Sequence, residues 1–349
     1  MKKLILTLLS AATLLQLHAD ENPQPAPTKF WGDSNAYLQR QANVMFDLVD
    51  RQLDAVQPSA GADPTRLMTL ANLDMLLHDT GNDNSPAALA FLNGRVEKTA
   101  ARMNKPVQSG YELHKIYNAG FVARTPSASL AFDIVRGLCH DTPMIADTTI
   151  QKIADSCDAM FITHNHSDHG DPAVVEMFLQ AGKPVIAVPE FMPDDNRLIH
   201  IRPAEGAHTD EPFVLPDGDS LRLMIFPGHQ DDLMNNLYVI TTPEGFTFAN
   251  SGDQYQSGSE DMEWIPSITP LLPKVDIFML NCWNTRIPAI TAAFNPRYVV
   301  TAHENEMGHT IDHREAFWLT FQKFAPVSTP YVVMGWGECF VPEMTSSGK

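Results

Sequence analysis

A run of nine residues, Thr163–Asp171, follows an apolar stretch and contains three histidines and two aspartates. Imidazole and carboxylate groups are ligands that Zn²⁺ and related divalent ions take in proteins. In an extended segment, residues i and i+2 point the same way, so His164 and His166 are placed to hold one ion. A turn in the middle of the run would direct Asp168 and His169 toward a second ion. The run therefore predicts a metal-dependent enzyme.

The residues around this run predict a strand, a loop, a helix and another strand. Ala159–Thr163 is apolar enough for a buried strand. Asp171 is a good helix N-cap, Pro172 a good first helical residue, and Gly182 a good helix end. Residues 184–188 then form the next strand. The metal-type residues thus follow the carboxyl end of a strand, where α/β folds commonly place their sites.

Three later strand-like stretches also lead to metal-type residues. One such ending is compatible with chance, but four endings indicate that several strands deliver ligands to one edge of a sheet. Residues 221–226 lead to His229, a hairpin of residues 236–241 and 246–250 leads to Asp253, and residues 297–302 lead to His303. Further strands are expected over residues 116–124, 127–135 and 275–280, with a turn near residues 125–126.

The motif His164–His169 reads His-x-His-x-Asp-His and resembles the signature of the metallo-β-lactamase superfamily. Gly228-His229, Gly252-Asp253 and His303 resemble the later motifs of that family, so the likeness covers about residues 111–340. It implies an α/β fold, a four-layer αβ/βα sandwich with a two-metal site at one edge. The run His303–His309 is similar to lactonase-like metallohydrolases related to ascorbate-phosphate lactonase.

The same resemblance implies a role for each ligand. His164, His166 and His229 would hold the first ion, and Asp168, His169 and His303 the second. Asp253 would bridge both ions, because a carboxylate has two oxygens whereas a neutral imidazole has one free lone pair. Asp168 would exchange a proton with the leaving atom, and His309 would contact the substrate or transition state. Zinc is the expected metal, with manganese and iron as alternatives.

Several residues near these motifs keep alternative interpretations. His303 competes with His309 and His313 for the last ligand position, and it is preferred because it directly follows an apolar strand. Asp133 either supports a metal ligand through a hydrogen bond or faces the surface of an edge strand. The alternative to a metal ligand at Asp253 is an ordinary aspartate in a turn. The alternative to a catalytic centre for the whole histidine-rich run is a structural zinc site, although such sites favour cysteine.

The first part of the chain is expected to lie outside the catalytic fold. Residues 1–19 have two lysines, an apolar stretch and a small residue at the cleavage position, which is typical of a signal peptide. Residues 20–34 are predicted as a linker, residues 35–110 as a helical extension and residues 111–349 as the hydrolase domain. Within the extension, one helix begins at Pro64 and ends near Leu77, and another begins at Ser85-Pro86. The extension either lines the substrate pocket or only stabilises the fold.

Charge and cysteine content limit the partners and the compartment. The formal net charge of −18 disfavours a nucleic acid substrate. A cleaved signal peptide predicts a periplasmic or secreted protein with no integral membrane segment. Four cysteines (Cys139, Cys157, Cys282 and Cys339) permit disulfides in that compartment, but buried free thiols are equally compatible with the apolar runs around them. The oligomeric state is not readable from the sequence.

These observations predict an exported two-metal hydrolase that uses a metal-bridging hydroxide on a small ester or lactone-like molecule. A phosphodiesterase or phospholipid-type hydrolase of the same fold is the nearest enzymatic alternative. A non-catalytic metal-binding protein is the alternative from another class. Antibiotic hydrolysis is disfavoured, because Cys282 does not fall at a ligand position.

Overall fold

The computed structural model describes residues 33–79, 86–139, 142–255 and 261–343. The predicted signal peptide and residues 20–32 of the predicted linker lie outside these residues. Contacts within the chain divide it into Met1–Gln41 and Ala42–Lys349, and the layers below belong to the second unit. Within the described residues, no helix is long and apolar enough to cross a membrane. The predicted boundaries at residues 35, 110 and 349 stay a prediction.

The first of two large sheets has seven strands. Their spatial order is β16 (Glu338–Phe340), β1 (Glu112–Tyr117), β2 (Gly120–Arg124), β3 (Ser129–Phe132), β6 (Ala159–Phe161), β7 (Val185–Ala187) and β8 (Ile199–His200). Strands β3, β6, β7 and β8 are parallel to one another, whereas the pairs β16–β1, β1–β2 and β2–β3 are antiparallel. A separate ribbon pairs β4 (Leu138–Cys139) with β5 (Thr142–Pro143).

The second sheet also has seven strands. Their order is β15 (Tyr331–Val332), β14 (Tyr298–Ala302), β13 (Ile277–Asn281), β12 (Thr247–Asn250), β11 (Leu233–Thr241), β10 (Ser220–Gln230) and β9 (Thr209–Val214). The strands from β12 to β15 are parallel, and those from β9 to β12 are antiparallel. Both sheets are therefore mixed, and each contains a parallel half whose carboxyl ends can carry a site.

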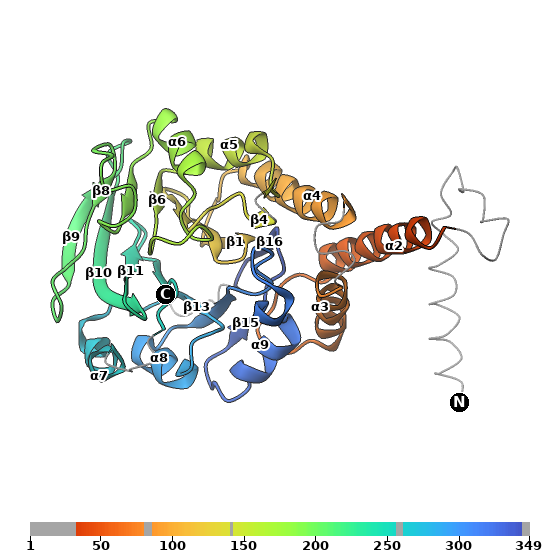
Figure 1. Cartoon of the computed structure of the whole chain (residues 1–349). Helices are drawn as coiled ribbons and strands as arrows, with labels where there is room; N and C mark the ends of the chain where they lie inside the picture. The colour runs from red at the N-terminus through yellow and green to blue at the C-terminus, as the bar shows by residue number, and fades with distance from the viewer. Residues whose placement is uncertain (1–32, 80–85, 140–141, 256–260, 344–349) are drawn as a thin grey trace. The chain divides into compact units, whose positions relative to one another are not determined.

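Helices cover the outer face of each sheet (Figure 1). An apolar layer of side chains fills the space between the sheets. The inner layer joins side chains such as Phe161 of β6 and Tyr238 of β11. The first sheet is covered by α3 (Pro64–Leu77), α4 (Pro86–Met103), α5 (Asp147–Asp155), α6 (Pro172–Gln180) and part of α2 (Ser34–Ala55). The second is covered by η1 (Ile265–Leu271) and α8 (Ile287–Phe294), beside α7 (Asp261–Trp264). This arrangement confirms the predicted αβ/βα sandwich with N-terminal helices.

Local capping rules place several helix ends correctly. The helix predicted from Pro64 to Leu77 is α3, and Asp63 caps it by accepting a hydrogen bond from the backbone N–H of Arg66. The side chain of Asp171 caps α6 in the same way by accepting from the backbone N–H of Ala173 at 2.9 Å. A capping carboxylate satisfies an otherwise unpaired N–H in the first helical turn.

Two strand predictions are wrong in detail. Residues 116–124 do not form one strand, because Asn118 adopts a left-handed conformation (φ +44°) between β1 and β2. The strand predicted for residues 221–226 continues as β10 to Gln230, pairing with β11 as far as the register Gln230–Leu233. His229 therefore lies inside a hairpin rather than in a loop after a strand.

The helical extension is joined to the sandwich by buried polar contacts. Arg66 of α3 forms a two-pronged ion pair with Glu338 of β16, at 2.7 and 2.9 Å. Asp74 of α3 accepts hydrogen bonds from the backbone N–H groups of Phe317 and Trp318, which begin α9 (Phe317–Phe324). These contacts join α3 to the sandwich, and the role of the extension stays a prediction.

Among the described residues, Cys157, Cys282 and Cys339 are buried free thiols. This agrees with the expectation that the cysteines in apolar runs pack as small hydrophobic side chains.

Candidate metal centre

The His-x-His-x-Asp-His loop is tied to both sheets before it turns. Asp133, directly after β3, accepts hydrogen bonds from the backbone N–H and the hydroxyl of Thr163, each at 2.8 Å. His164 then forms an isolated β-bridge with Asn235 of β11. The start of the loop is thus held by one residue from each sheet, and the histidines that follow are fixed at the sheet edge.

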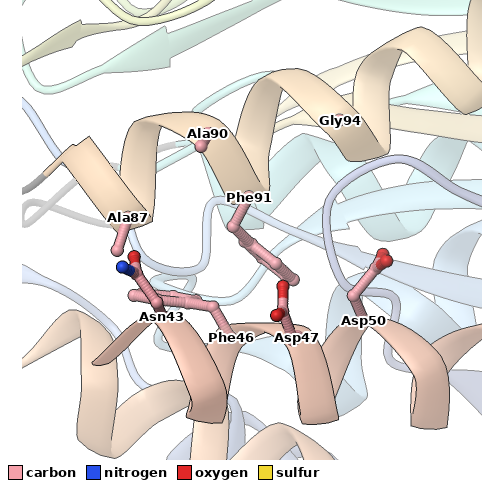
Figure 2. Close-up of a pocket in the computed structure, with 8 residues that line it drawn as sticks. All are labelled: Asn43, Phe46, Asp47, Asp50, Ala87, Ala90, Phe91 and Gly94. Atoms are coloured by element: carbon pink, nitrogen blue, oxygen red, sulfur yellow. The ribbon is translucent and has the colours of Figure 1, made fainter. Parts of the chain in front are cut away.

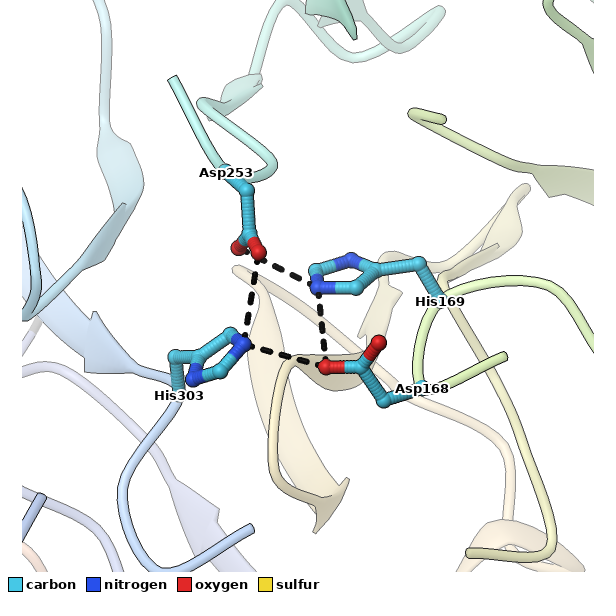
Figure 3. Close-up of side chains that lie close together, drawn as sticks. All are labelled: Asp168, His169, Asp253 and His303. Carbon is cyan, nitrogen blue, oxygen red and sulfur yellow. Dashed lines mark hydrogen bonds and ion pairs between the residues drawn. The ribbon is translucent and has the colours of Figure 1, made fainter. Parts of the chain in front are cut away.

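Four side chains from three strand ends converge beside this loop (Figure 3). They are Asp168, His169, Asp253 and His303. Nε2 of His303 lies 3.0 Å from Oδ2 of Asp168 and 3.3 Å from Oδ2 of Asp253. Nε2 of His169 lies 3.1 Å from Oδ1 of Asp253. The ligand atoms all lie within 4.8 Å of one another, which is close enough for one ion to contact all four.

A second group shares one member with the first. His164, His166 and Asp253 also place one ligand atom each within 4.8 Å. Nε2 of His164 lies 3.7 Å from Oδ2 of Asp253. Asp253 therefore faces both groups, as a bridging carboxylate must. The structure brings together six of the seven predicted ligands in this way.

Burial and neighbouring charges oppose each other in the four-residue group. Burial lowers the pKa of His303, but Asp253 and Asp168 outweigh it and raise that pKa to about 10. Burial likewise lowers the pKa of His169, and three aspartates raise it well above its usual range. Burial raises the pKa of Asp253, but His169 and His303 lower it by more, so the net effect is a decrease. The carboxylates thus attract positive charge strongly, whether it comes from a proton or from a metal ion.

Unpartnered nitrogens indicate that the two groups fit divalent ions. Within the described part of the chain, Nε2 of His164 and Nε2 of His169 are buried and make no hydrogen bond, and the carboxylate of Asp253 approaches them at 3.7 and 3.1 Å. A buried polar atom without a partner is costly. A metal ion would satisfy both nitrogens, and a set of imidazoles and carboxylates suits zinc, manganese and iron.

The other ring nitrogen of each of these histidines is held in place. Nδ1 of His169 lies 3.0 Å from Oδ2 of Asp133, and both side chains are fully buried. Nδ1 of His164 lies 3.1 Å from Oγ1 of Thr163. Since a carboxylate only accepts, a neutral His169 ring carries its proton on Nδ1 and keeps the lone pair of Nε2 for a ligand. Of the two interpretations of Asp133, the structure supports the one in which it holds a predicted ligand.

His229, the seventh predicted ligand, belongs to neither group. Its Nδ1 lies 3.1 Å from both carboxylate oxygens of Asp261. Its Nε2 lies 3.0 Å from Nη2 of Arg202. His229 is thus oriented like a metal-binding histidine, but an arginine contacts the nitrogen that would bind.

His309 lies next to the four-residue group, as expected for a substrate contact. Its ring centroid is 5.7 Å from that of His303 and 6.1 Å from that of Trp283. Burial and the nearby His303 lower its pKa, so the ring is neutral near pH 7. His313 is exposed, and its ring centroid lies 6.2 Å from that of Trp283, which favours a structural role for it. The substrate contact by His309 stays a prediction.

Sequence reasoning missed three amides that contact the predicted ligands. Asn281 donates to Oδ1 of Asp253 at 2.6 Å, and Gln230 donates to Oδ2 of Asp253 at 3.1 Å. Asn118 donates to Oδ2 of Asp168 at 3.4 Å. Asn281 is the last residue of β13 and directly follows the strand predicted over residues 275–280, so the rule that selected His303 would also have selected Asn281.

A third group of candidate ligands lies away from this centre. Glu112, His114 and Cys339 also place one ligand atom each within 4.8 Å. Arg124 binds Glu112 at 2.8 Å, and Arg102 approaches it at 3.5 Å. Two guanidinium groups already neutralise this carboxylate, so the third group does not suit a cation.

A pocket of about 400 Å³ lies between α2 and α4 (Figure 2). Phe46 and Phe91 form its apolar part, with ring centroids 5.1 Å apart, and Asp47 and Asp50 add carboxylates. None of its lining residues belongs to the candidate metal centre. It is therefore separate from any substrate site formed by His309 and the predicted ligands.

No protein-family model matches the sequence, and no curated protein matches it. Several solved structures are similar in fold. A metallo hydrolase from Ignicoccus hospitalis has 18% identity and a TM-score of 0.48, over 67% of this chain and 99% of that one. The isothiocyanate hydrolase from Delia radicum gut bacteria has 15% identity and a TM-score of 0.47, over 66% and 98%.

CmlA, a diiron β-hydroxylase from Streptomyces venezuelae, has 14% identity and a TM-score of 0.46, over 75% of this chain and 63% of that one. The three matched proteins differ in the reactions that their names describe. With identities and TM-scores this low, the function proposed below rests on this chain's own residues.

Proposed function

We propose that this protein is an exported hydrolase that binds two divalent metal ions and cleaves a small ester or lactone-like molecule. The observation that carries the proposal is Asp253, whose carboxylate lies close to both groups of candidate ligands. Its Oδ1 is 3.1 Å from Nε2 of His169, and its Oδ2 is 3.3 Å from Nε2 of His303 and 3.7 Å from Nε2 of His164. Keeping so many ionisable groups buried at one edge is costly unless cations compensate them. The His164/His166 group and the Asp168/His169/His303 group would each hold one ion, with Asp253 between them.

Divalent ions bound there would supply Lewis acidity and would lower the pKa of water from ~16 toward ~7. The chain's own residues keep the centre in one geometry. Asn281 and Gln230 each donate to a different oxygen of Asp253, so its carboxylate cannot rotate freely. Asp133 fixes the ring of His169, and Thr163 contacts the ring of His164. Because these contacts hold the candidate ligands in place, the centre needs less rearrangement when substrate binds.

Proton transfer is assigned to Asp168. Its Oδ2 lies 3.0 Å from Nε2 of His303 and 3.4 Å from Nδ2 of Asn118, so one oxygen is held by the centre. The other oxygen would exchange a proton with the leaving oxygen of an ester. His309 lies beside His303 and, as a neutral imidazole, would hydrogen-bond the substrate.

The substrate class follows from charge and from the narrower likeness to lactonase-like metallohydrolases. A net charge of −18 disfavours polyanionic substrates. We therefore place small esters and lactones ahead of phosphodiesters and phospholipid head groups.

A substrate panel with defined metals tests the proposal. Metal-stripped protein would be reloaded separately with Zn²⁺, Mn²⁺ and Fe²⁺ and assayed on esters, lactones, amides and phosphodiesters. We expect metal-dependent turnover of esters or lactones, and its loss in Asp253→Ala. Asp232→Ala, an exposed aspartate in the turn between β10 and β11, is the matched control and should keep full activity.

Three results would reject parts of this proposal. Turnover of phosphodiesters alone would favour the alternative substrate class. Metal binding without turnover of any substrate would favour a non-catalytic metal-binding protein. A metal content near zero after reconstitution would reject the centre itself.

Export is a separate part of the proposal and rests on residues 1–19 alone. The full chain would be expressed in a bacterial host, and the intact mass of the protein would be measured after cell fractionation. We expect a mature protein in the periplasm or medium that begins at Asp20. An uncleaved cytosolic product would contradict export while leaving the hydrolase proposal untouched.

A further inference from the structure

His229 has only one nitrogen available for a metal ion. Both oxygens of Asp261 lie 3.1 Å from Nδ1 of His229. Asp261 is itself fixed by hydrogen bonds from Gln254 and Trp264. Because a carboxylate only accepts hydrogen bonds, the proton of the neutral ring resides on Nδ1, and Nε2 carries the single free lone pair.

Arg202 uses that lone pair. Its Nη2 lies 3.0 Å from Nε2 of His229. Its Nη1 donates to the backbone carbonyl of Gly228 at 3.2 Å, and Nη2 also donates to Glu205 at 2.9 Å. A guanidinium group has five donors and no acceptor, so its contact with Nε2 consumes the lone pair. His229 cannot bind Arg202 and a metal ion through Nε2 at the same time.

The position of His229 relates it to the group of His164 and His166. His164 forms a β-bridge with Asn235, and Asn235 lies opposite Gly228 in the β10–β11 hairpin. Strand β11 thus lies between the histidine-rich loop and β10. His229 follows Gly228, and the next residue, Gln230, donates to Oδ2 of Asp253 at 3.1 Å, so the strand end that carries His229 reaches the centre. The four-residue group with His303 has a complete set of ligands without His229.

We propose that Arg202 competes with a divalent cation for His229, so that the two ions of the centre bind in a fixed order. The first ion enters the group of Asp168, His169, Asp253 and His303. The second enters the group of His164 and His166 more weakly, because it must displace Arg202 from His229. This inference rests on the proposed two-metal centre and adds a control on its occupancy.

Burial and charge make Arg202 an effective competitor. Its side chain is 7% exposed, and it stays charged at every physiological pH. A hydrogen bond from a charged donor in such a place is stronger than an ordinary one. The loss of this hydrogen bond, together with the repulsion between Arg202 and the nearby ion, would lower the affinity for the second ion by roughly tenfold to a hundredfold.

The arginine can release His229 without becoming unpaired. Glu205, whose side chain is 62% exposed, accepts from Nη2 and also lies 3.5 Å from Nε2 of His229, and the carbonyl of Gly228 holds Nη1. Both partners remain when Nη2 leaves Nε2. A high metal concentration would therefore shift Arg202 toward Glu205, and His229 would complete the second site.

Calorimetric titration of the metal-stripped full chain with Zn²⁺ tests this order. We expect two binding steps in the wild type, separated by about tenfold or more. In Arg202→Met the second step should tighten by roughly tenfold while the first stays unchanged. Arg222→Met removes an exposed arginine from the same region of the second sheet and should change neither step.

A second background shows whether Arg202 acts through His229. In His229→Ala the second step should be weak, and adding Arg202→Met should no longer tighten it. If Arg202→Met tightens the second step equally in both backgrounds, the effect is general charge repulsion and the competition is wrong. Arg202→Gln, which removes the charge but keeps donors, should give an intermediate shift and serves if the methionine variant fails to fold.

The outcomes separate this inference from the proposed function. Two ions bound with equal affinity, or no change in Arg202→Met, would overturn the competition and leave the two-metal centre standing. Absence of any Zn²⁺ binding would overturn both.

Discussion

Nδ1 of His169 lies 3.0 Å from Oδ2 of Asp133, and neither side chain is exposed to solvent. Asp133 follows β3, His169 follows β6, and the two strands are parallel neighbours. The same carboxylate accepts two hydrogen bonds from Thr163 and one from Asn250. One aspartate thus fixes the start of the histidine-rich loop and the ring of a predicted ligand, from a position with a left-handed backbone (φ +47°).

Replacing Asp133 should weaken metal binding without removing a ligand. We expect Asp133→Asn to lower the affinity of the tighter ion by about 10- to 100-fold, because the amide no longer holds the proton of His169 on Nδ1. Competition with a chelating dye would measure the loss. Asp276→Asn is the control, since Asp276 is also buried and accepts a backbone hydrogen bond, from Thr247, but lies before β13. Equal affinities in the wild type and Asp133→Asn would contradict this role.

Gly252 should tolerate no side chain. It has φ +48°, and an added Cβ would lie 2.3 Å from Oδ1 of Asn235 and 2.6 Å from Thr163. Asn235 also accepts from the backbone N–H of Asp253, so the clash would move the shared carboxylate. We expect Gly252→Ala to destabilise the protein by about 2–4 kcal/mol and to reduce the bound metal.

Gly94 provides the matched comparison for that substitution. It lies inside α4 with open space around it, and an alanine there should stabilise the helix by about 0.5–1 kcal/mol. Urea unfolding of both variants would measure the changes. A Gly252→Ala variant as stable as wild type would show that the loop after β12 adjusts.

Removing only one partner of the buried pair of Lys115 and Glu304 should destabilise the protein more than removing both. Both side chains are fully buried, and Lys115 also donates to the carbonyl of Thr301 at 3.2 Å. Lys115→Met should destabilise the fold by about 3–5 kcal/mol, because it leaves an unpaired carboxylate inside the protein. Adding Glu304→Gln should recover part of that loss.

An exposed pair gives the contrast for this experiment. Lys98 is 47% exposed and binds Asp50 and Asp54. Lys98→Met should change the free energy of unfolding by no more than about 1 kcal/mol. If both lysine substitutions cost the same in urea unfolding, burial of the Lys115–Glu304 pair does not control its contribution.

Asp74 should make stability fall as the pH rises. Burial raises its pKa from 3.8 to about 6, against the lowering effect of hydrogen bonds from Asn305, Phe317 and Trp318. The folded state therefore holds a proton that the unfolded state has already lost. The stabilisation from this group is complete below pH 3.8 and is lost as the pH rises through about 6.

Comparison with Asp74→Asn isolates this effect. The difference in unfolding free energy, wild type minus variant, should decrease by on the order of 3 kcal/mol between pH 4 and pH 7. Urea unfolding in the presence of a chelator would measure it, since both proteins then lack metal. Parallel pH profiles for the two proteins would contradict a raised pKa at Asp74.

Local chemistry in the sequence determined a large part of this molecule. Asp63 and Asp171 cap α3 and α6 because a short carboxylate can reach the N–H groups of the next turn without help from the rest of the fold. The motif from His164 to His169 likewise specified its own turn. The apolar strand before His303 predicted where that histidine would lie.

The tertiary structure alone decided how these groups meet. Whether Asp253 faces two groups, whether Asp133 is buried against His169, and whether Arg202 contacts His229 all depend on strand order and on the continuation of β10 through the hairpin. These contacts join residues far apart in the chain, and their distances are set by packing between the sheets. Residue type and spacing determine local preferences, so the sequence by itself indicated the candidate ligands. Only the folded chain decided that Arg202 contacts Nε2 of His229.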